Sequence, residues 1–337
     1  MIKEAINSLV SGNSLDFEDA AGAMEEIMGG EATPAQIAAF VTALRIKGED
    51  VEEIAGLASV MRAKSIQVKA TPPLVDTCGT GGDSSSSINI STAAAFVVAG
   101  AGLKVAKHGN RAMSSRCGSA DVLEMLGVKI DLGAEAVAEC LETVGIGFMF
   151  APIFHPAMKH AAGPRREIGI RTIFNILGPL TNPAHAEFQV IGVAIEELGG
   201  KIAAVLHRLG TKHSLVVHGN GMDELSISGQ SLVWEVDEHG VSPPYEVFPQ
   251  QFGFKEASLA EIRGGSPEEN AGILCLILDG KKGPLRDIVV MNAAAALVAG
   301  NRASDLKEGA LLAEEAIDRG RARKKLDEMI KLSQSLG

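Results

Sequence analysis

The sequence predicts an α/β protein, with a small all-helical N-terminal domain and a large α/β domain whose mostly parallel central sheet is flanked by helices. Residues 1–70 show only helical spacing of apolar residues, whereas short apolar runs alternate with helical stretches over residues 71–337. Repeated strand-then-helix order favours a parallel sheet. A chain of 337 residues, 46% of them hydrophobic, can bury a sizeable core, and Thr71-Pro72-Pro73 is the expected linker.

The N-terminal segment predicts helices and no strand. Apolar residues at helical spacing predict a first helix over residues 2–10 and a second from Phe17 to Met28, which stops at Gly29-Gly30. A capping box with a proline at the first helical position, Thr33-Pro34-Ala35-Gln36, begins a third helix, and Asp50 with Glu53 begins a fourth. These helices carry no catalytic constellation of side chains. We therefore expect them to serve packing or subunit contact.

The remaining chain predicts strands alternating with helices. Strands are expected at residues 74–75, 103–106, 128–130, 146–150, 188–194 and 213–218, with an antiparallel strand at 231–236. Helices are expected at residues 93–101, from near Gly118, through 137–141 and through 202–206. Helices also cover much of the chain after Pro267, and a charged amphipathic helix is expected from about Lys307.

Charge and cysteine usage disfavour several classes of protein. Lys plus Arg total 31 and Asp plus Glu total 42, so the formal net charge is −11, which argues against a nucleic-acid-binding protein. The four cysteines form no Cys-x-x-Cys pair, which disfavours zinc and redox sites and suits a reducing cytoplasm. Charged residues interrupt the N-terminus, so we expect no signal peptide, and no apolar run approaches membrane length.

The loop after residues 74–75 is suited to binding an anion. It reads Gly79-Thr80-Gly81-Gly82-Asp83, and glycines let a ligand approach the bare backbone. Successive N–H groups and the positive end of the following helix attract negative charge. Ser91 and Thr92 stand where that helix begins, so their hydroxyls can cap it, donate to phosphate or bind a hard cation.

A second loop follows the next strand and supplies fixed positive charge from Lys107 and Arg111. Ligands of open α/β sheets lie at the carboxyl ends of the strands, so two neighbouring loops predict one phosphorylated substrate between them. The first loop is not a Walker A motif, because no Gly-Lys-Ser/Thr closes it. Ser84 also breaks G-x-G-x-x-G, which disfavours a dinucleotide site. Taken alone, residues 79–83 could also form a plain tight turn.

Two further motifs carry charge. Asp223 and Glu224 follow the strand at 213–218, where adjacent carboxylates can hold Mg²⁺ directly or through water, although alone they could form a solvated acidic turn. Arg165 and Arg166 stand before an expected apolar helix over residues 168–173. A guanidinium can grip a carboxylate through two hydrogen bonds.

The combination of these motifs resembles the anthranilate phosphoribosyltransferases, which share a fold group with the pyrimidine nucleoside phosphorylases. The resemblance rests on GTGGD, NIST, KHGNR and GSADVLE between Gly79 and Glu124, on the Thr33 to Gln36 region, on the segment from Arg165 to Pro183, and on GMDELS from Gly221. It implies transfer of the 5-phosphoribosyl group from phosphoribosyl pyrophosphate to the amine of anthranilate, a step of tryptophan biosynthesis. It also implies Mg²⁺ and a homodimer formed through the helical domain. We expect about residues 163–185 to join that domain in space.

The resemblance assigns the site residues. For phosphoribosyl pyrophosphate it implies Gly79, Gly82, Asp83, Ser87, Asn89, Ser91, Thr92 and Lys107. For anthranilate it implies Gly79, His108, Asn110 and Arg165, and for Mg²⁺ it implies Ser91, Asp223 and Glu224. Positioning and charge neutralisation can carry the reaction, so no certain catalytic residue is assigned, and His108 is the weaker alternative of a general base. Ser84, Ala112 and Cys117 depart from the residues usual in the family.

Two alternatives stand beside this prediction. A nucleoside phosphorylase is the nearer one, but those enzymes usually read KHSGRG in the second loop, and the Asp223-Glu224 pair favours magnesium pyrophosphate over free phosphate. A non-catalytic paralogue that binds nucleic acid is the other, and the net charge of −11 disfavours it.

Overall fold

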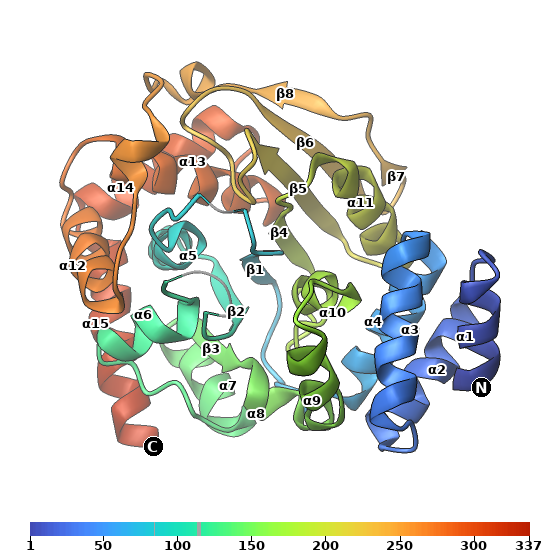
Figure 1. Cartoon of the computed structure of the whole chain (residues 1–337). Coiled ribbons are helices and arrows are strands. Elements are labelled where there is room, and N and C mark those ends of the chain that lie inside the picture. Colours follow the sequence, from blue (N-terminus) through green and yellow to red (C-terminus); the bar gives the residue numbers. More distant parts are fainter. Residues whose placement is uncertain (84, 113–115) are drawn as a thin grey trace.

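The N-terminal part of the chain is helical, as predicted (Figure 1). The computed structural model describes residues 1–83, 85–112 and 116–337. The first helices are α1 (Ile2–Val10), α2 (Phe17–Gly29), α3 (Pro34–Lys47) and α4 (Val51–Lys64). Thr33 and Gln36 form the predicted capping box at the start of α3, and Asp50 donates its backbone N–H to Glu53 Oε2 at 2.8 Å before α4. These local signals therefore fix where both helices begin.

The larger part of the chain is built on one mostly parallel sheet. Within the described residues it has eight strands in the order β3-β2-β1-β4-β5-β6-β7, with β8 paired to β6. β1 to β5 run parallel, and β6 is antiparallel to β5, β7 and β8. The strands are β1 (Leu74–Gly79), β2 (Lys104–Gly109), β3 (Ile146–Phe150), β4 (Phe188–Gly192), β5 (His213–Gly219), β6 (Ser231–Asp237), β7 (Gly240–Val241) and β8 (Tyr245–Val247). Because β1 and β2 are neighbours, the loops that follow them meet at one edge of the sheet.

Helices cover both faces of this sheet (Figure 1). α5 (Ile90–Gly100) and α13 (Pro284–Ala299) pack on one face, whereas α7 (Ala134–Thr143) and α11 (Gly199–Arg208) cover the other. Side chains alternate accordingly, since Val190 joins the apolar cluster of α5 and α13, and Ile191 joins that of α11. The remaining α-helices are α6 (Ser119–Met125), α8 (Ala151–Phe154), α9 (Lys159–Ile168), α10 (Ile173–Leu177), α12 (Pro267–Leu278), α14 (Leu306–Asp318) and α15 (Arg321–Leu336).

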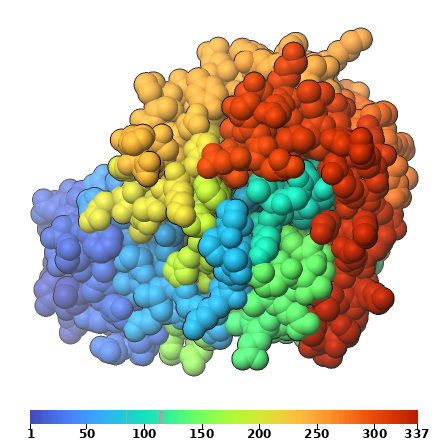
Figure 2. Space-filling model, turned by 180° about the vertical axis from the view of Figure 1, so that it is seen from behind, coloured from blue at the N-terminus to red at the C-terminus, as the bar shows by residue number. Residues whose placement is uncertain are grey.

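α9 and α10 lie between the N-terminal helices and the sheet (Figure 1). Ile173, Phe174 and Leu177 of α10 belong to the same buried apolar cluster as residues of α1 to α4. The same cluster also contains residues of α11 and β4, so it does not by itself divide the chain. The packing of α9 against α2 and α3, and of α10 against α3 and α4, supports our proposal that residues 1–70, joined by about 163–185, form the helical domain, and that residues 71–337 form the other. Seen from behind, the N-terminal helices and α15 lie at opposite sides of the molecule (Figure 2).

Some predicted elements were wrong. Residues 128–130 form a loop and no strand. Val128 and Ile130 pack into the main apolar cluster directly from this loop, so their burial needs no sheet partner. The helix expected from about Lys307 is two helices, which Gly320 separates in a left-handed conformation with φ of 68°. The short strands β7 and β8 were not predicted. No described helix combines the length and the apolar character needed to cross a membrane.

The close crossing of α2 and α4 generates a stability prediction. A Cβ atom on Gly56 would lie 2.4 Å from the carbonyl oxygen of Phe17, so Gly56→Ala must push the two helices apart. We expect this substitution to lower the free energy of unfolding by about 1–3 kcal/mol in urea denaturation. Gly272→Ala is the control, since Gly272 is exposed in α12 with no atom within 4 Å, and it should cost nothing or gain up to about 1 kcal/mol. A Gly56→Ala protein as stable as the wild type would contradict this packing.

Candidate active site

A cavity of about 650 Å³ opens at the carboxyl ends of β1 and β2, opposite α9 and α10. Its walls are the glycine-rich loop after β1, the start of α5, the loop after β2, the α8–α10 region and the turn after β5. The structure brings every predicted site residue to this cavity, namely Gly79, Gly82, Asp83, Ser87, Asn89, Ser91, Thr92, Lys107, His108, Asn110, Arg165, Asp223 and Glu224. A concave pocket with several convergent polar side chains is the usual setting of a substrate site.

The glycine-rich loop is packed tightly against the turn after β5. Gly79 and Gly192 are partners in the β1–β4 register, and a Cβ atom on either would meet Asp223 at 2.2 Å and 1.6 Å, respectively. The loop is further fixed by its backbone, since Thr80 N donates to Gly192 O at 2.9 Å and Gly81 N donates to Asp223 Oδ2 at 2.7 Å. The paired glycines therefore make the room in which the carboxylate turn sits.

The turn after β5 places carboxylates where their charge is poorly solvated. Burial, followed by the charge of Asp83, raises the pKa of Asp223 to about 7. Burial, followed by the charge of Asp223, raises the pKa of Glu224 well above its usual value. Ser91 donates its backbone N–H to Glu224 Oε1 at 3.2 Å, which joins this turn to the start of α5. Burial and mutual repulsion thus both oppose the charged forms of these carboxylates.

The donor chemistry of this turn fits Mg²⁺. Carboxylate and hydroxyl oxygens from Asp223, Glu224 and Ser91 are hard ligands, and Mg²⁺ commonly keeps several waters and binds substrate phosphates. Among the described residues, no three His, Cys, Asp or Glu side chains form a complete metal cage.

Lys107 is buried in β2 and directed at the start of α5. Its Nζ donates to Thr77 O at 2.6 Å and to Ser91 Oγ at 3.3 Å. Burial lowers the pKa of Lys107, while the charge of Asp76 opposes that shift. Asp76 is itself held by Asn182, whose Nδ2 donates to Asp76 Oδ2 at 2.7 Å. The ammonium charge is thus anchored beside the serine hydroxyl predicted to face the ligand.

Asn89 and Ser87 occupy the approach to α5. Asn89 is the N-cap residue of α5 but makes no side-chain capping bond. Its Nδ2 donates to Cys117 O at 3.0 Å, and its Oδ1 accepts from Asn270 Nδ2 at 2.9 Å. Ser87 forms an isolated bridge to Arg263. Asn89 therefore ties the first loop to the second and to α12, a contact that sequence spacing did not reveal.

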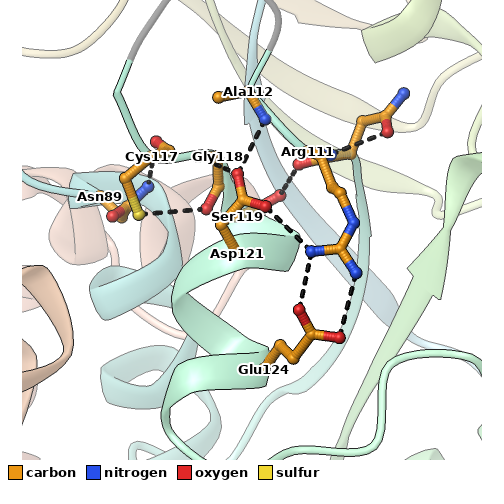
Figure 3. A network of polar contacts seen from close by, with 9 residues as sticks. Asn89, Arg111, Ala112, Cys117, Gly118, Ser119, Asp121 and Glu124 are labelled. Carbon is orange, nitrogen blue, oxygen red and sulfur yellow. Dashed lines mark hydrogen bonds and ion pairs between the residues drawn. The ribbon is translucent and has the colours of Figure 1, made fainter. Parts of the chain in front are cut away.

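The second loop differs from the prediction at Arg111. Figure 3 shows its guanidinium held by α6, with Nη1 at 2.7 Å from Glu124 and at 3.0 Å from Asp121. Asp121 also accepts from the N–H groups of Ala112 and Gly118, at 2.9 Å and 2.8 Å. Arg111 closes the base of this loop. The expectation that it supplies free positive charge to the ligand between the two loops was therefore wrong. Residues 113–115, like Ser84, lie outside the described residues.

The aromatic end of the cavity contains a pair of buried histidines. The rings of His108 and His155 lie with centroids 5.0 Å apart, and both Nε2 atoms are buried without a hydrogen-bond partner in the described structure. Burial lowers the pKa of His108 to about 3 and that of His155 to about 4. Both imidazoles are therefore neutral near pH 7 and suited to contact a flat, partly polar ligand.

Arg165 lies in the last turn of α9, and the predicted helix over residues 168–173 was wrong. Gly169, with φ of 68°, ends α9, and a separate helix, α10, begins at Ile173. The Arg165 guanidinium lies over the ring of Phe174, 5.0 Å from its centroid. Burial lowers the pKa of Arg165.

Among the cavity-lining residues that the sequence did not assign to the site are His155 and Arg171. Arg171 Nη2 donates to Thr80 O at 2.9 Å and to Gly81 O at 2.7 Å, across the cavity from α5. The basic run from 165 to 171 was the available signal for it, but spacing alone did not indicate which arginine faces the glycine-rich loop.

Two family models match the chain. The helical bundle domain of the glycosyl transferase family matches residues 3–65, and the a/b domain of that family matches residues 71–323. The fold and the site thus define a glycosyl transferase with a helical domain and an α/β domain.

Curated relatives and solved structures identify the family within the glycosyl transferases more narrowly. The anthranilate phosphoribosyltransferase of Dehalococcoides mccartyi is 60% identical to this chain, over 100% of this chain and 99% of the relative. That of Chloroflexus aggregans is 57% identical, over 99% of this chain and 98% of the relative. The Thermus thermophilus enzyme superposes with a TM-score of 0.93 at 44% identity, covering 98% of this chain and 99% of that one. The Saccharomyces cerevisiae enzyme in complex with PRPP and Mg gives 0.91 at 30% identity, covering 99% and 98%. The chain belongs to the anthranilate phosphoribosyltransferase family, which confirms the resemblance that its motifs indicated.

The contact between Gly192 and the carboxylate turn generates a prediction. Gly192→Ala would place a methyl group 1.6 Å from the Asp223 carbonyl oxygen, so the turn must move away from the glycine-rich loop. We expect magnesium-dependent turnover to fall by about tenfold or more, measured as initial rate against Mg²⁺ concentration. Gly163→Ala, in α9 with no atom within 4 Å, should remain close to wild type. Unchanged magnesium dependence in Gly192→Ala would contradict the role given to this close approach.

Proposed function

We propose that the protein transfers the 5-phosphoribosyl group from phosphoribosyl pyrophosphate to the amine of anthranilate, releasing pyrophosphate, in the second step of tryptophan biosynthesis from chorismate. The main support for this reaction is that the glycine-rich loop, the start of α5 and the turn containing Asp223 and Glu224 line one cavity. Yeast relatives have been solved with PRPP and Mg and with 4-fluoroanthranilate, which supports the same pair of substrates here.

The phosphoribosyl pyrophosphate occupies the side of the cavity near α5. Its contacts are Gly79, Gly82, Asp83, Ser87, Asn89, Ser91, Thr92 and Lys107. The N–H groups at the start of α5 and the Lys107 ammonium offset the negative charge of the substrate. Ser91, Asp223 and Glu224 hold Mg²⁺, which supplies charge neutralisation to the departing pyrophosphate.

Anthranilate occupies the opposite, more apolar side. Gly79, His108, Asn110 and Arg165 address it, and Arg165 is suited to its carboxylate because a guanidinium can donate two parallel hydrogen bonds. An arylamine is neutral at pH 7, so its attack on the anomeric carbon needs little activation by a base. The protein then works chiefly by positioning the two substrates and by stabilising charge on the leaving group.

Assembly and location follow the family pattern in this proposal. A homodimer forms through the helical domain, where Val10 and Ile46 are 72% and 82% exposed and offer apolar surface. The four cysteines are free, which suits a reducing cytoplasm. No nucleic acid or membrane partner is proposed.

The carboxylate turn gives the direct test of this function. Wild-type protein should consume anthranilate, seen as loss of its fluorescence, only when phosphoribosyl pyrophosphate and Mg²⁺ are both present. Asp223→Asn with Glu224→Gln should reduce this turnover by about a hundredfold or more while the protein stays folded, because neutral amides bind Mg²⁺ poorly and carry no buried charge. The control is Glu196→Gln with Glu197→Gln, an exposed adjacent pair. Wild-type turnover in the 223/224 variant would remove the metal assignment.

The neutral histidine pair generates a pH prediction. With pKa values of about 3 and about 4, His108 and His155 do not change charge between about pH 6 and 8. At saturating Mg²⁺ and phosphoribosyl pyrophosphate, kcat/KM for anthranilate should show no inflection near about 6.5, the ordinary histidine pKa. The contrary result is a fall in kcat/KM below that pH. If this fall is lost in His108→Asn but kept in His239→Asn, a control at an exposed site, His108 is a general base.

A further inference from the structure

We propose that Arg171 is a positioning residue that fixes the orientation of two peptide groups in the glycine-rich loop and, through one of them, the Asp223 carboxylate. The inference rests on the proposed function, because that loop is where the pyrophosphate group is placed. Arg171 has no role in the assignment of substrate or metal contacts given above. It comes from the connection between α9 and α10, on the far side of the cavity from α5.

The contacts of Arg171 are with consecutive carbonyl groups. Its Nη2 donates to Thr80 O at 2.9 Å and to Gly81 O at 2.7 Å. A planar guanidinium keeps its N–H groups in a rigid fork, so it can hold neighbouring acceptors in one arrangement better than an ammonium can. One side chain therefore joins the α9–α10 connection to the loop after β1.

The peptide between Thr80 and Gly81 lies between opposite charges. In a trans peptide the C=O and N–H groups point in opposite directions. The C=O of Thr80 faces Arg171, and the N–H of the same peptide, which belongs to Gly81, donates to Asp223 Oδ2 at 2.7 Å. The next peptide has its Gly81 carbonyl on Arg171, so the N–H of Gly82 points away from the guanidinium. Arg171 and Asp223 thus act on the same peptide plane from its two sides.

This loop needs such a restraint because of its glycines. Gly81 and Gly82 have φ of 66° and 78°, and glycine reaches both positive and negative φ at little cost. A flipped peptide would turn a carbonyl oxygen toward Asp223 and toward a bound pyrophosphate, which are both negative. Arg171 favours the observed orientation, because only then do both carbonyls meet its N–H groups. Gly82 also admits the guanidinium, since a Cβ atom there would lie 1.7 Å from Arg171 Nη1.

The neighbouring cations are held elsewhere. Arg111 is paired with Asp121 and Glu124, and Arg165 lies over Phe174. Lys107 donates to Thr77 O and to Ser91 Oγ. The orientation of the glycine-rich loop is therefore attributed to Arg171 and not to the general positive charge of the cavity.

The test compares Arg171→Met with Arg166→Met. Methionine keeps an unbranched apolar stem without N–H donors, and Arg166 is an exposed arginine at the end of α9. Arg171→Met should raise both KM for phosphoribosyl pyrophosphate and the half-saturating Mg²⁺ concentration by about tenfold to a hundredfold, since two charged hydrogen bonds are lost and each is worth about tenfold. KM for anthranilate and the unfolding midpoint should stay at wild-type values, and Arg171→Lys should recover only part of the loss. Arg166→Met should match the wild type throughout.

A double-mutant cycle separates a positioning role from a direct contact with the substrate. Losses from Arg171→Met and Asp223→Asn should be less than additive, because both residues act on one peptide. Additive losses would overturn the proposal, as would an unchanged KM for phosphoribosyl pyrophosphate or an equal rise in KM for anthranilate. Titration calorimetry of phosphoribosyl pyrophosphate with Mg²⁺ reports the same difference without turnover. An inactive wild type would therefore refute the proposed reaction, while calorimetry would still decide the role of Arg171.

Discussion

The site depends on the close approach of Asp223 to two glycines paired across β1 and β4, with its carboxylate against Gly79 and its backbone against Gly192. Gly79 and Gly192 leave no side chain at this contact, so the turn after β5 can reach the glycine-rich loop. The N–H of Gly81 then meets the Asp223 carboxylate, and Ser91 N meets that of Glu224. A parallel sheet brings the loops of separate strands to one edge. Because Gly79 and Gly192 have no Cβ atom, the loops after β1 and β5 can approach to hydrogen-bonding distance.

The same packing buries charge that only a ligand can fully offset. Asp223, Glu224 and Lys107 lie in a poorly solvated corner, and the pKa shifts of all three oppose their charged forms. In the proposed function, a divalent cation and a diphosphate would supply charges of both signs there. On the other side of the cavity, α9 contributes Arg165 beside the histidine pair of His108 and His155. The carboxylate turn and the Arg165 side of the site therefore line one cavity.

Much of this could be predicted from the sequence, because its signals are local. The capping boxes at Thr33 and Asp50, the glycine-rich loop and the alternation of strands and helices all follow from residue type and spacing. Contacts between distant residues could not be predicted this way. The pairing of Arg111 with α6 and the reach of Arg171 to Thr80 depend on tertiary geometry. Residues 128–130 look like a strand because burial selects the same apolar residues in a loop.

The most direct measurement is a crystal structure with phosphoribosyl pyrophosphate and Mg²⁺ bound. We expect the pyrophosphate oxygens to accept hydrogen bonds from N–H groups of the loop at residues 79–83 and of the start of α5. We also expect Mg²⁺ between those oxygens and the Asp223 and Glu224 carboxylates, at about 2.1 Å from direct ligands or one water away. Pyrophosphate bound away from the glycine-rich loop, or Mg²⁺ held without either carboxylate or their waters, would contradict this expectation.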